Sequence, residues 1–484
     1  MKSATVHRLY PNSPASAQQA AAEFEAIEGS PDAASQGMAA SILSHTLNIF
    51  SSDGERERTQ RNAIAAFGVR CLSAGLLYLS QIVLARWMGG SEYGIYVAVW
   101  TWVLILGGLC NLGLNLAIIR LAPVYRETGE LARLRGLIHG SRLVSLAVGT
   151  LIMAVGILGL SLFKPYIDSH FVLPVYLALV CVPLYALTDV QDGIGRGNAW
   201  MGLALIPPYV LRPVLMLASM FVAVQLGLEM NAATAAGGAI IATWGAGIVQ
   251  TALINKRLKD SIPAGAREYT FGPWLKTSLP LLVILGCELL MQNADVLVIS
   301  HYMTPADVGI YFAAGKTMAL IMFVHYAVGS AVANKFAALN ARGDKESLRA
   351  FVKDAVNWTF WPSLAGAAII LALGKPLLWL FGPQFAAGYP VMCILVVGFL
   401  FRSSMGPAEF LLNMLGEQTL CATVLTAAAM LNVALNFALV PNFGLVGAAA
   451  ATSISLMMAA LMNSIVVWRR LDIEIAIWRN LPKF

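Results

Sequence analysis

The chain has 484 residues, of which 58% are hydrophobic and only 12% are charged. A soluble domain carries about a quarter charged residues, so this composition indicates that lipid surrounds most of the folded chain. The formal net charge of +6 does not call for a nucleic-acid partner, because the basic residues follow a membrane-topology pattern described below. The six cysteines all lie in apolar segments without a CxxC motif, so neither disulfides nor structural zinc are expected.

Residues 1–61 differ from the rest of the chain. Ala, Ser, Gln and Gly dominate this stretch, and it contains no apolar run long enough for a secretory signal. We interpret residues 1–61 as a disordered cytoplasmic tail.

Beyond the tail, apolar windows recur at lengths that cross ~30 Å of hydrocarbon as helices. The sequence predicts twelve of them, at 62–84, 93–116, 137–163, 171–188, 201–224, 233–254, 275–299, 308–332, 354–374, 389–412, 419–440 and 444–467. The expected fold is therefore an all-α polytopic membrane protein with about 12 transmembrane helices.

The distribution of Lys and Arg predicts the orientation of these helices. With the N-terminus inside, 25 of the 32 basic residues fall on the cytoplasmic side, and the outer loops hold only Arg86, Lys164 and Lys375. This asymmetry follows the positive-inside rule and places both termini in the cytoplasm. The outer loops are too short to house a catalytic domain, so a membrane-embedded polymerase or glycosyltransferase is disfavoured and we expect no enzyme.

An internal repeat divides the chain into two halves. Met88-Gly-Gly-Ser-Glu-Tyr-Gly-Ile-Tyr96 returns as Met303-Thr-Pro-Ala-Asp-Val-Gly-Ile-Tyr311, and Gly238-Ala-Ile-Ile-Ala-Thr243 returns as Gly447-Ala-Ala-Ala-Ala-Thr452. The repeat predicts two six-helix bundles, 62–254 and 275–468. A cytoplasmic linker, 255–274, joins them, and a cytoplasmic tail, 469–484, follows.

Four basic residues fall inside predicted spans: Arg70, Arg212, Lys316 and Arg402. A charge at membrane depth costs about 3 kcal/mol on insertion scales, so such groups face a cavity or a partner. An arginine fork holds two phosphate oxygens at once and stays protonated. These four residues are therefore the candidate binding groups for a pyrophosphate that crosses the membrane, with Arg212 and Arg402 as its direct ligands.

Acidic residues at membrane depth are fewer, and two interpretations of them stay open. Glu288 near mid-helix and Asp295 further along the same helix are candidates for coupling transport to H⁺ or Na⁺. Alternatively, Glu288 neutralises one of the arginines as a structural pair. No other cofactor is expected.

Uncharged polar side chains complete the candidate cavity lining. Asn111, Asn115, Asn293 and Asn432 lie inside predicted spans and offer hydrogen bonds to sugar hydroxyls. For any single one of them, a hydrogen bond between helices is the competing interpretation.

Several motifs resemble one membrane-protein family. Ala85-Arg-Trp-Met-Gly-Gly-Ser-Glu-Tyr-Gly94, Asn111-Leu-Gly-Leu-Asn115 and Arg120-Leu-Ala-Pro resemble the bacterial polysaccharide-lipid flippases (Wzx-like) of the multidrug/oligosaccharidyl-lipid/polysaccharide exporter superfamily. Leu415-Gly-Glu-Gln418 and Leu439-Val-Pro-Asn-Phe-Gly444 are similar to the C-terminal half of that family. The likeness covers roughly residues 62–468.

The resemblance implies a flippase of the bacterial inner membrane. Its two bundles would alternate access between the leaflets, and its cargo would be a polyprenyl-pyrophosphate carrying an oligosaccharide for O-antigen, exopolysaccharide or capsule synthesis. Expected partners are this lipid-linked substrate, membrane lipid and the polysaccharide polymerase or export machinery. Two alternatives on the same fold stay open: a cation-coupled multidrug antiporter and a peptidoglycan-precursor (lipid II) flippase.

Overall fold

A computed structural model describes residues 55–166 and 168–480, without the side chains of 55–67, 69–71 and 334. The chain forms two units, Met1–Gly68 and Val69–Phe484. In the first unit only the start of helix α3 is described. Most of the expected 1–61 tail thus lies outside the described residues, and Glu55–Arg61, which we expected in the tail, are helical. The second unit, described below, is helical throughout its regular elements.

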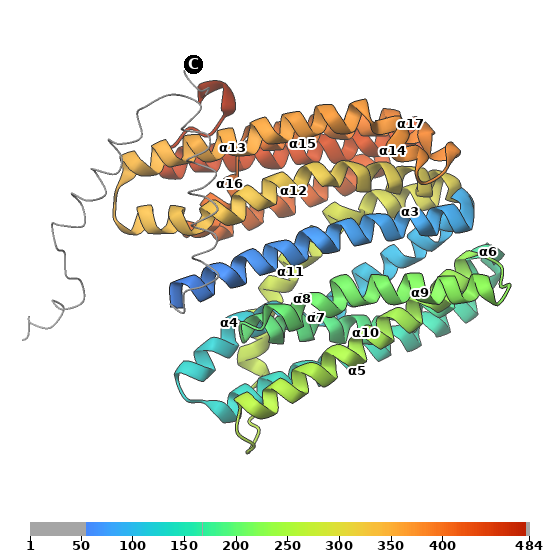
Figure 1. The fold of residues 1–484 in the computed structure, drawn as a ribbon, viewed down its shortest axis with the longest axis horizontal. Helices are drawn as coiled ribbons and strands as arrows, with labels where there is room; N and C mark the ends of the chain where they lie inside the picture. Colours follow the sequence, from blue (N-terminus) through green and yellow to red (C-terminus); the bar gives the residue numbers. More distant parts are fainter. Residues whose placement is uncertain (1–54, 167, 481–484) are drawn as a thin grey trace, which may run out of the picture. The chain divides into compact units, whose positions relative to one another are not determined.

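The N-terminal half contains the following elements in chain order: α3 (Glu55–Cys110), α4 (Leu114–Glu127), α5 (Leu131–Phe163), η1 (Lys164–Tyr166), α6 (Ser169–Leu179), α7 (Val182–Gly197), α8 (Met201–Ile206), η2 (Pro207–Leu211), α9 (Arg212–Gln225) and α10 (Ala232–Ser261). The C-terminal half contains α11 (Phe271–Tyr302), α12 (Pro305–Ala341), α13 (Lys345–Ala372), α14 (Gly374–Trp379), η3 (Pro383–Gly388), α15 (Tyr389–Ser404), α16 (Ala408–Met414), α17 (Gln418–Leu471) and η4 (Ile477–Arg479). In the second unit, α4–α10 and α12–α17 form two groups (Figure 1).

Nine helices of the described residues are long and apolar enough to cross a membrane, or ten if the bent pair α6–α7 is one span. The sequence predicted twelve windows, and the difference has a local cause. Window 62–84 and most of window 93–116, which runs on into α4, lie in α3, and α3 has non-helical backbone at Gly89 (φ 77°). Windows 419–440 and 444–467 both lie in α17, which has non-helical backbone at Gly444 (φ 57°).

The connection between the halves is shorter than the predicted 255–274 linker, because α10 continues to Ser261 and α11 begins at Phe271. Residues 262–270, between these two helices, form hydrogen bonds with the start of α5. Arg135 donates from Nε to the Ala266 carbonyl oxygen at 2.8 Å, and the Glu268 amide donates to the Ala132 carbonyl oxygen at 3.0 Å.

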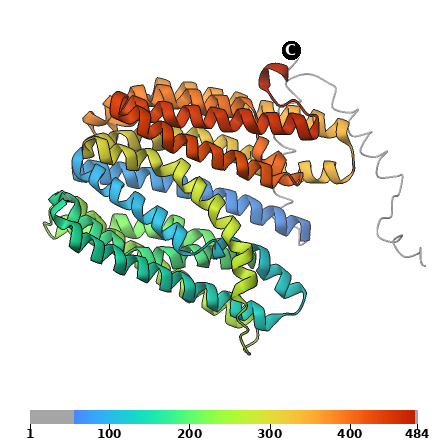
Figure 2. The same cartoon turned by 180° about the vertical axis from the view of Figure 1, so that it is seen from behind.

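Helix α11 contacts both halves. Near its start, the Trp274 indole donates to the Tyr125 hydroxyl at 3.3 Å, so this end packs on the N-terminal half. Further along, α11 makes its most extensive contact with α17 in the C-terminal half. Figure 2 shows α11 crossing diagonally from one group of helices to the other. The helix is thus a continuous connection between the halves within the membrane-crossing region.

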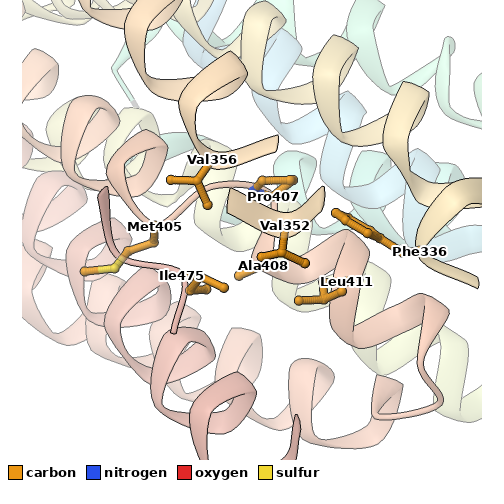
Figure 3. A pocket seen from close by; sticks show the side chains of 8 residues that line it. All are labelled: Phe336, Val352, Val356, Met405, Pro407, Ala408, Leu411 and Ile475. Carbon is orange, nitrogen blue, oxygen red and sulfur yellow. The ribbon is translucent and has the colours of Figure 1, made fainter. Parts of the chain in front are cut away.

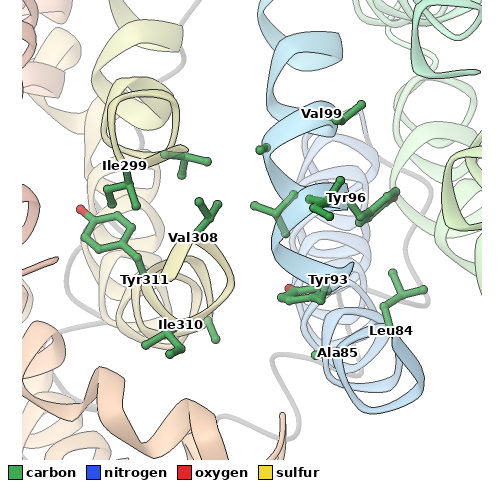
Figure 4. Close-up of a cluster of buried hydrophobic side chains, with 14 of the residues drawn as sticks. Leu84, Ala85, Tyr93, Tyr96, Val99, Ile299, Val308, Ile310 and Tyr311 are labelled. Carbon is green, nitrogen blue, oxygen red and sulfur yellow. The ribbon is translucent and has the colours of Figure 1, made fainter. Parts of the chain in front are cut away.

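The two copies of the sequence repeat pack against each other. A Cβ on Gly94 would lie 1.6 Å from the Pro305 carbonyl oxygen and 3.1 Å from the Gly309 amide nitrogen. Figure 4 shows the apolar side chains beside this contact, with Tyr93 and Tyr96 on α3 and Val308 and Ile310 on α12. Glycine is required here because only its lack of a side chain lets the two backbones come this close.

The C-terminal residues 472–480 fold back onto the C-terminal half. Ile473, Ile475 and Ile477 alternate along the chain, and all three are buried. A period of two is that of extended backbone, so one side of the segment is apolar. Figure 3 shows Ile475 among Val352, Met405 and other residues of α13 and the α15–α16 break. We expected a cytoplasmic tail over 469–484, and its described part is packed against the helices.

The Gly94 contact supports a prediction about stability. Gly94→Ala should lower the free energy of unfolding by about 1–3 kcal/mol, because the added methyl group overlaps the Pro305 carbonyl and forces the two backbones apart. The matched control is Gly237→Ala in α10, where an added Cβ meets nothing within 4 Å. Thermal unfolding of the purified variants in one detergent measures the difference, and equal melting temperatures for the two would contradict the packing described.

Candidate functional site

Arg212 is presented by an irregular turn. Pro207–Leu211 form a π-helical turn between α8 and α9, and the Arg212 amide donates to the Pro207 carbonyl oxygen, five residues back. Prolines lack the amide donor that a regular α-helical ladder needs, which explains why this turn is wider than the helices around it.

The neighbours of the Arg212 guanidinium are aromatic. Its central carbon lies 5.1 Å from the ring centroid of Tyr185 and 5.9 Å from that of Trp100. The two rings meet edge to face, with centroids 6.3 Å apart. Within the part of the chain that the structure describes, no carboxylate forms an ion pair with Arg212. The ring faces stabilise the cation without neutralising it, so its charge is available to an anion.

Arg402 has a different environment. Its Nη2 atom lies 2.9 Å from Oε1 and 2.7 Å from Oε2 of Glu409, and the two side chains are only 13% and 18% exposed. The pair spans the break between α15 and α16. We expected Arg402 to hold pyrophosphate beside Arg212, but the structure shows that its charge is balanced within the protein. A partner seven residues away is visible in the sequence, but only the break at Met405–Pro407 brings it into contact.

The interpretation of Glu288 as the structural partner of an arginine is not supported by the geometry. Glu288 is exposed on α11 and makes no ion pair with a described residue, and Glu409 takes that role instead. Close to the Arg402–Glu409 pair, His325 is buried, and neither of its ring nitrogens has a hydrogen-bond partner among the described atoms. The Tyr326 ring lies 5.9 Å from the Arg402 guanidinium carbon.

Asp295 lies in a network of three helices. Its carboxylate accepts hydrogen bonds from the Tyr311 hydroxyl at 2.6 Å and from the Thr452 hydroxyl at 3.4 Å. Asn432 donates to Thr452 from the same α17, also at 3.4 Å. The side-chain oxygen of Asn436, one turn further, is buried and has no hydrogen-bond partner among the described atoms. One carboxylate surrounded by neutral oxygens matches the ligand chemistry of a hard cation, and it can also hold a proton.

Lys316 is an accessible amine on α12, 4.8 Å from the Phe312 ring centroid. The next residue, Thr317, shares a hydrogen bond of 3.0 Å with the hydroxyl of Tyr78 on α3. Lys316 therefore lies where the C-terminal half meets the first span. Arg70 belongs to α3, but its side chain is outside the described residues.

The predicted sugar-path asparagines have local partners. Asn111 is buried and accepts from the Gly113 amide, and Asn115 is half-buried and accepts from the Leu116 amide. Asn293 is buried and donates to the Leu289 carbonyl oxygen. Asn111, Asn115 and Asn293 thus bond to backbone groups of their own segment. Of the four, Asn432 takes part in contacts between helices, as the competing interpretation expected.

Together these observations define a polytopic helical membrane protein that keeps charged groups between its helices. The sequence profile of a family described as polysaccharide biosynthesis protein matches residues 59–333, more than half of the chain, so the protein belongs to that family. The predicted relationship to polysaccharide-lipid flippases is thereby confirmed.

Two relatives support this placement. The chain is 22% identical over 412 residues to a probable low-salt glycan biosynthesis flippase of Haloferax volcanii, covering 82% of this chain and 80% of the relative. It is 23% identical over 393 residues to a putative O-antigen transporter of Shigella flexneri, covering 78% and 90%. Both are named as proteins that move substrates, in agreement with the expectation that the chain is not an enzyme.

Solved structures show the same fold. An inward-facing multidrug resistance MATE family transporter of the MOP superfamily matches with a TM-score of 0.68 and 16% identity, over 82% of this chain and 94% of that one. The lipid II flippase MurJ in an inward closed conformation matches with a TM-score of 0.67 and 17% identity, over 84% and 87%. At these identities the likeness concerns the fold alone.

The Arg402–Glu409 pair yields a second prediction. Glu409→Ala should cost about 3–5 kcal/mol of stability, because it leaves a buried guanidinium without its counter-charge. The double variant Arg402→Leu/Glu409→Leu should regain most of that loss, since no charge is then left unpaired. Thermal unfolding of the purified single and double variants measures the coupling. If the double variant is as unstable as Glu409→Ala, the ion pair does not balance Arg402.

Proposed function

We propose that the protein moves a polyprenyl-pyrophosphate-linked oligosaccharide from the cytoplasmic to the periplasmic leaflet of a bacterial inner membrane, for the synthesis of a surface polysaccharide such as O-antigen, exopolysaccharide or capsule. The observation that carries this proposal is the guanidinium of Arg212, which lies against aromatic rings and forms no ion pair with a described carboxylate, inside the helices of a polysaccharide biosynthesis protein. The flippase and O-antigen transporter among its relatives support the same class of cargo.

The chemistry of Arg212 suits a pyrophosphate. A guanidinium presents several N–H donors in one plane, so it binds two phosphate oxygens at once and keeps its charge at any working pH. The rings of Tyr185 and Trp100 stabilise the guanidinium through their faces without forming a salt bridge with it. Lys316 and Arg70 add positive charge in this proposal, and the lipid tail stays in the bilayer.

We propose twelve crossings with both termini in the cytoplasm. A straight helix as long as α17, with its 54 residues, would measure about 80 Å, far more than the ~30 Å of hydrocarbon. If α3 and α17 each turn at their non-helical glycine, the ten spans become twelve. The positive-inside distribution then places both ends on the same, cytoplasmic side.

Alternating access requires one end of the protein to close. Arg86 at the predicted outer end donates from Nε to the Leu380 carbonyl oxygen at 2.6 Å and from Nη2 to that of Trp379 at 2.7 Å. Together with the Gly94 contact, these bonds hold the two halves together at that end. In our proposal this is the state that takes up substrate from the cytoplasmic side, and these contacts separate when it is released outside.

Two alternatives share the fold: a cation-coupled multidrug antiporter and a lipid II flippase, which the MATE and MurJ neighbours represent. A transporter of lipophilic cations needs bare carboxylates in its cavity. Asp295 is only 8% exposed and is hydrogen-bonded, which disfavours that role, although Glu288 is exposed. A lipid II flippase would be essential for growth even in a strain that makes no surface polysaccharide. This requirement distinguishes it from the flippase that we propose.

Removal of Arg212 tests the proposed function. Arg212→Ala should reduce surface polysaccharide by at least about tenfold, as expected for the loss of a charge-assisted contact to phosphate, while the protein level stays normal. Arg212→Lys should retain part of the activity, because a lysine keeps the charge but not the planar fork. Quantitative analysis of surface polysaccharide in a deletion strain carrying each variant measures this.

The control for charge is Arg120→Ala, because Arg120 is an exposed residue of α4. A leaflet assay with a lectin or glycosidase that does not cross the membrane should find the lipid-linked oligosaccharide retained in the cytoplasmic leaflet of the Arg212→Ala strain. Normal surface polysaccharide in a well-expressed Arg212→Ala strain would contradict the proposal.

Asp295 is our candidate for coupling to H⁺ or Na⁺. Asp295→Asn removes the charge but keeps the size and most hydrogen bonds, so transport should lose its dependence on the ion gradient while binding of the lipid substrate persists. Substrate flipping in proteoliposomes with an imposed H⁺ or Na⁺ gradient measures this. If Asp295→Asn responds to the gradient as the unmodified protein does, coupling lies elsewhere.

A further inference from the structure

One face of α7 remains open while the rest of the helix is buried. Eleven residues of α7 are buried, and the partly exposed ones are Tyr185, Asp189, Asp192 and Arg196, followed by Gly197 at the helix end. The spacing of four, three and four residues places these four side chains on one face. We call this set the α7 stripe. It covers about 16 Å of the helix at 1.5 Å per residue.

Tyr185 lies in the predicted span 171–188, and Asp189, Asp192 and Arg196 follow directly beyond its cytoplasmic end, still within the bent helix pair α6–α7. Charged side chains at the end of a span face water or a binding cavity rather than lipid. At its Tyr185 end the stripe adjoins the turn that carries Arg212, because the Tyr185 ring centroid lies 5.1 Å from the Arg212 guanidinium carbon.

The chemistry changes along the α7 stripe. At one end, the Tyr185 ring contacts the Arg212 guanidinium. At the other end, Asp192 and Arg196 form an ion pair, with Nη2 to Oδ2 at 2.8 Å. Between them, Asp189 forms no hydrogen bond with any donor in the described residues. The stripe thus offers a cation at one end and the carboxylate of Asp189 further along.

Each part of the α7 stripe suits a different part of a ligand. A carboxylate repels phosphate but accepts hydrogen bonds from hydroxyl groups, and such charge-assisted bonds are about twice as strong as neutral ones. An aromatic ring beside it offers an apolar face to the C–H groups of a sugar ring. A phosphorylated sugar, anionic at one end and rich in hydroxyls beyond it, matches this order of groups.

We infer that the α7 stripe is the sugar-binding part of the transport site, with the sugars nearest the pyrophosphate held by Asp189 and the face of Tyr185. This inference rests on the proposed function and adds a specificity-determining surface to it. None of the asparagines that the sequence suggested for this role lies on α7. Selection between sugars would come from Asp189, while Arg212 binds the phosphates that all such lipids share.

The test compares two lipids that differ only in the sugar. Dissociation constants of undecaprenyl pyrophosphate and undecaprenyl-pyrophosphate-N-acetylglucosamine are measured by native mass spectrometry with the full-length protein in detergent. The quantity of interest is the dissociation constant of the sugar-free lipid divided by that of the sugar-carrying lipid. This ratio isolates the contribution of the sugar to binding. For the unmodified protein, we expect the lipid that carries the sugar to bind more tightly.

Asp189→Asn should lower this ratio by about tenfold, as expected for the loss of hydrogen bonds to a charged acceptor. Arg212→Ala should weaken binding of both lipids and leave the ratio close to that of the unmodified protein. The matched control is Glu127→Gln, an exposed acid of α4. If Asp189→Asn does not yield folded protein, Asp189→Ser replaces it in the same comparison.

The outcomes separate this inference from the proposed function. An unchanged ratio in a folded Asp189 variant overturns the sugar-binding role of the α7 stripe while the proposed function stands. A protein that binds the sugar-carrying lipid no better than the sugar-free one also overturns the inference. An unmodified protein that binds neither lipid contradicts the proposed function itself.

Discussion

The close contact between the two copies of one glycine motif is the constraint on which the architecture depends. At Gly94 the chain of one half passes so near to Pro305 and Gly309 of the other that no side chain fits between them. Tyrosines and β-branched residues of the same motif surround this contact with an apolar core. A close contact at one end and a helix, α11, that continues from half to half determine where the other groups lie in this state.

The two arginines inside the helices, Arg402 and Arg212, are stabilised in different ways. Arg402 is bound to Glu409 across a helix break and contributes no net charge to its surroundings. Arg212 lies between two aromatic rings and keeps its charge. A cation held by ring faces is stabilised by less than a carboxylate would provide, and this difference leaves it able to bind a passing anion. The aromatic pair is therefore part of the site, although neither ring carries a charge.

The polar groups divide in a similar way. Asn111 and Asn293 bond to backbone groups of their own segment, where the amide satisfies a nearby N–H or C=O. Polar side chains on one face of α7 are instead partly exposed. A hydrogen-bonding side chain within a span can therefore be either buried between helices or accessible to a ligand. The packing of the neighbouring helices decides which.

Much of the fold and part of the site follow from the sequence by itself. Membrane crossing, the two repeated halves and the family depend on hydropathy, on the spacing of short motifs and on charge counts, all of which are local properties of the chain. Arg212 could also be singled out in this way, because a charge inside an apolar segment is conspicuous whatever surrounds it. The tertiary structure alone decided that Glu409 neutralises Arg402, that Trp100 and Tyr185 flank Arg212, and that Asp189 remains accessible. These are relations between residues on different helices or across a break, and the free energy of a charge depends on which groups packing brings within a few ångströms of it.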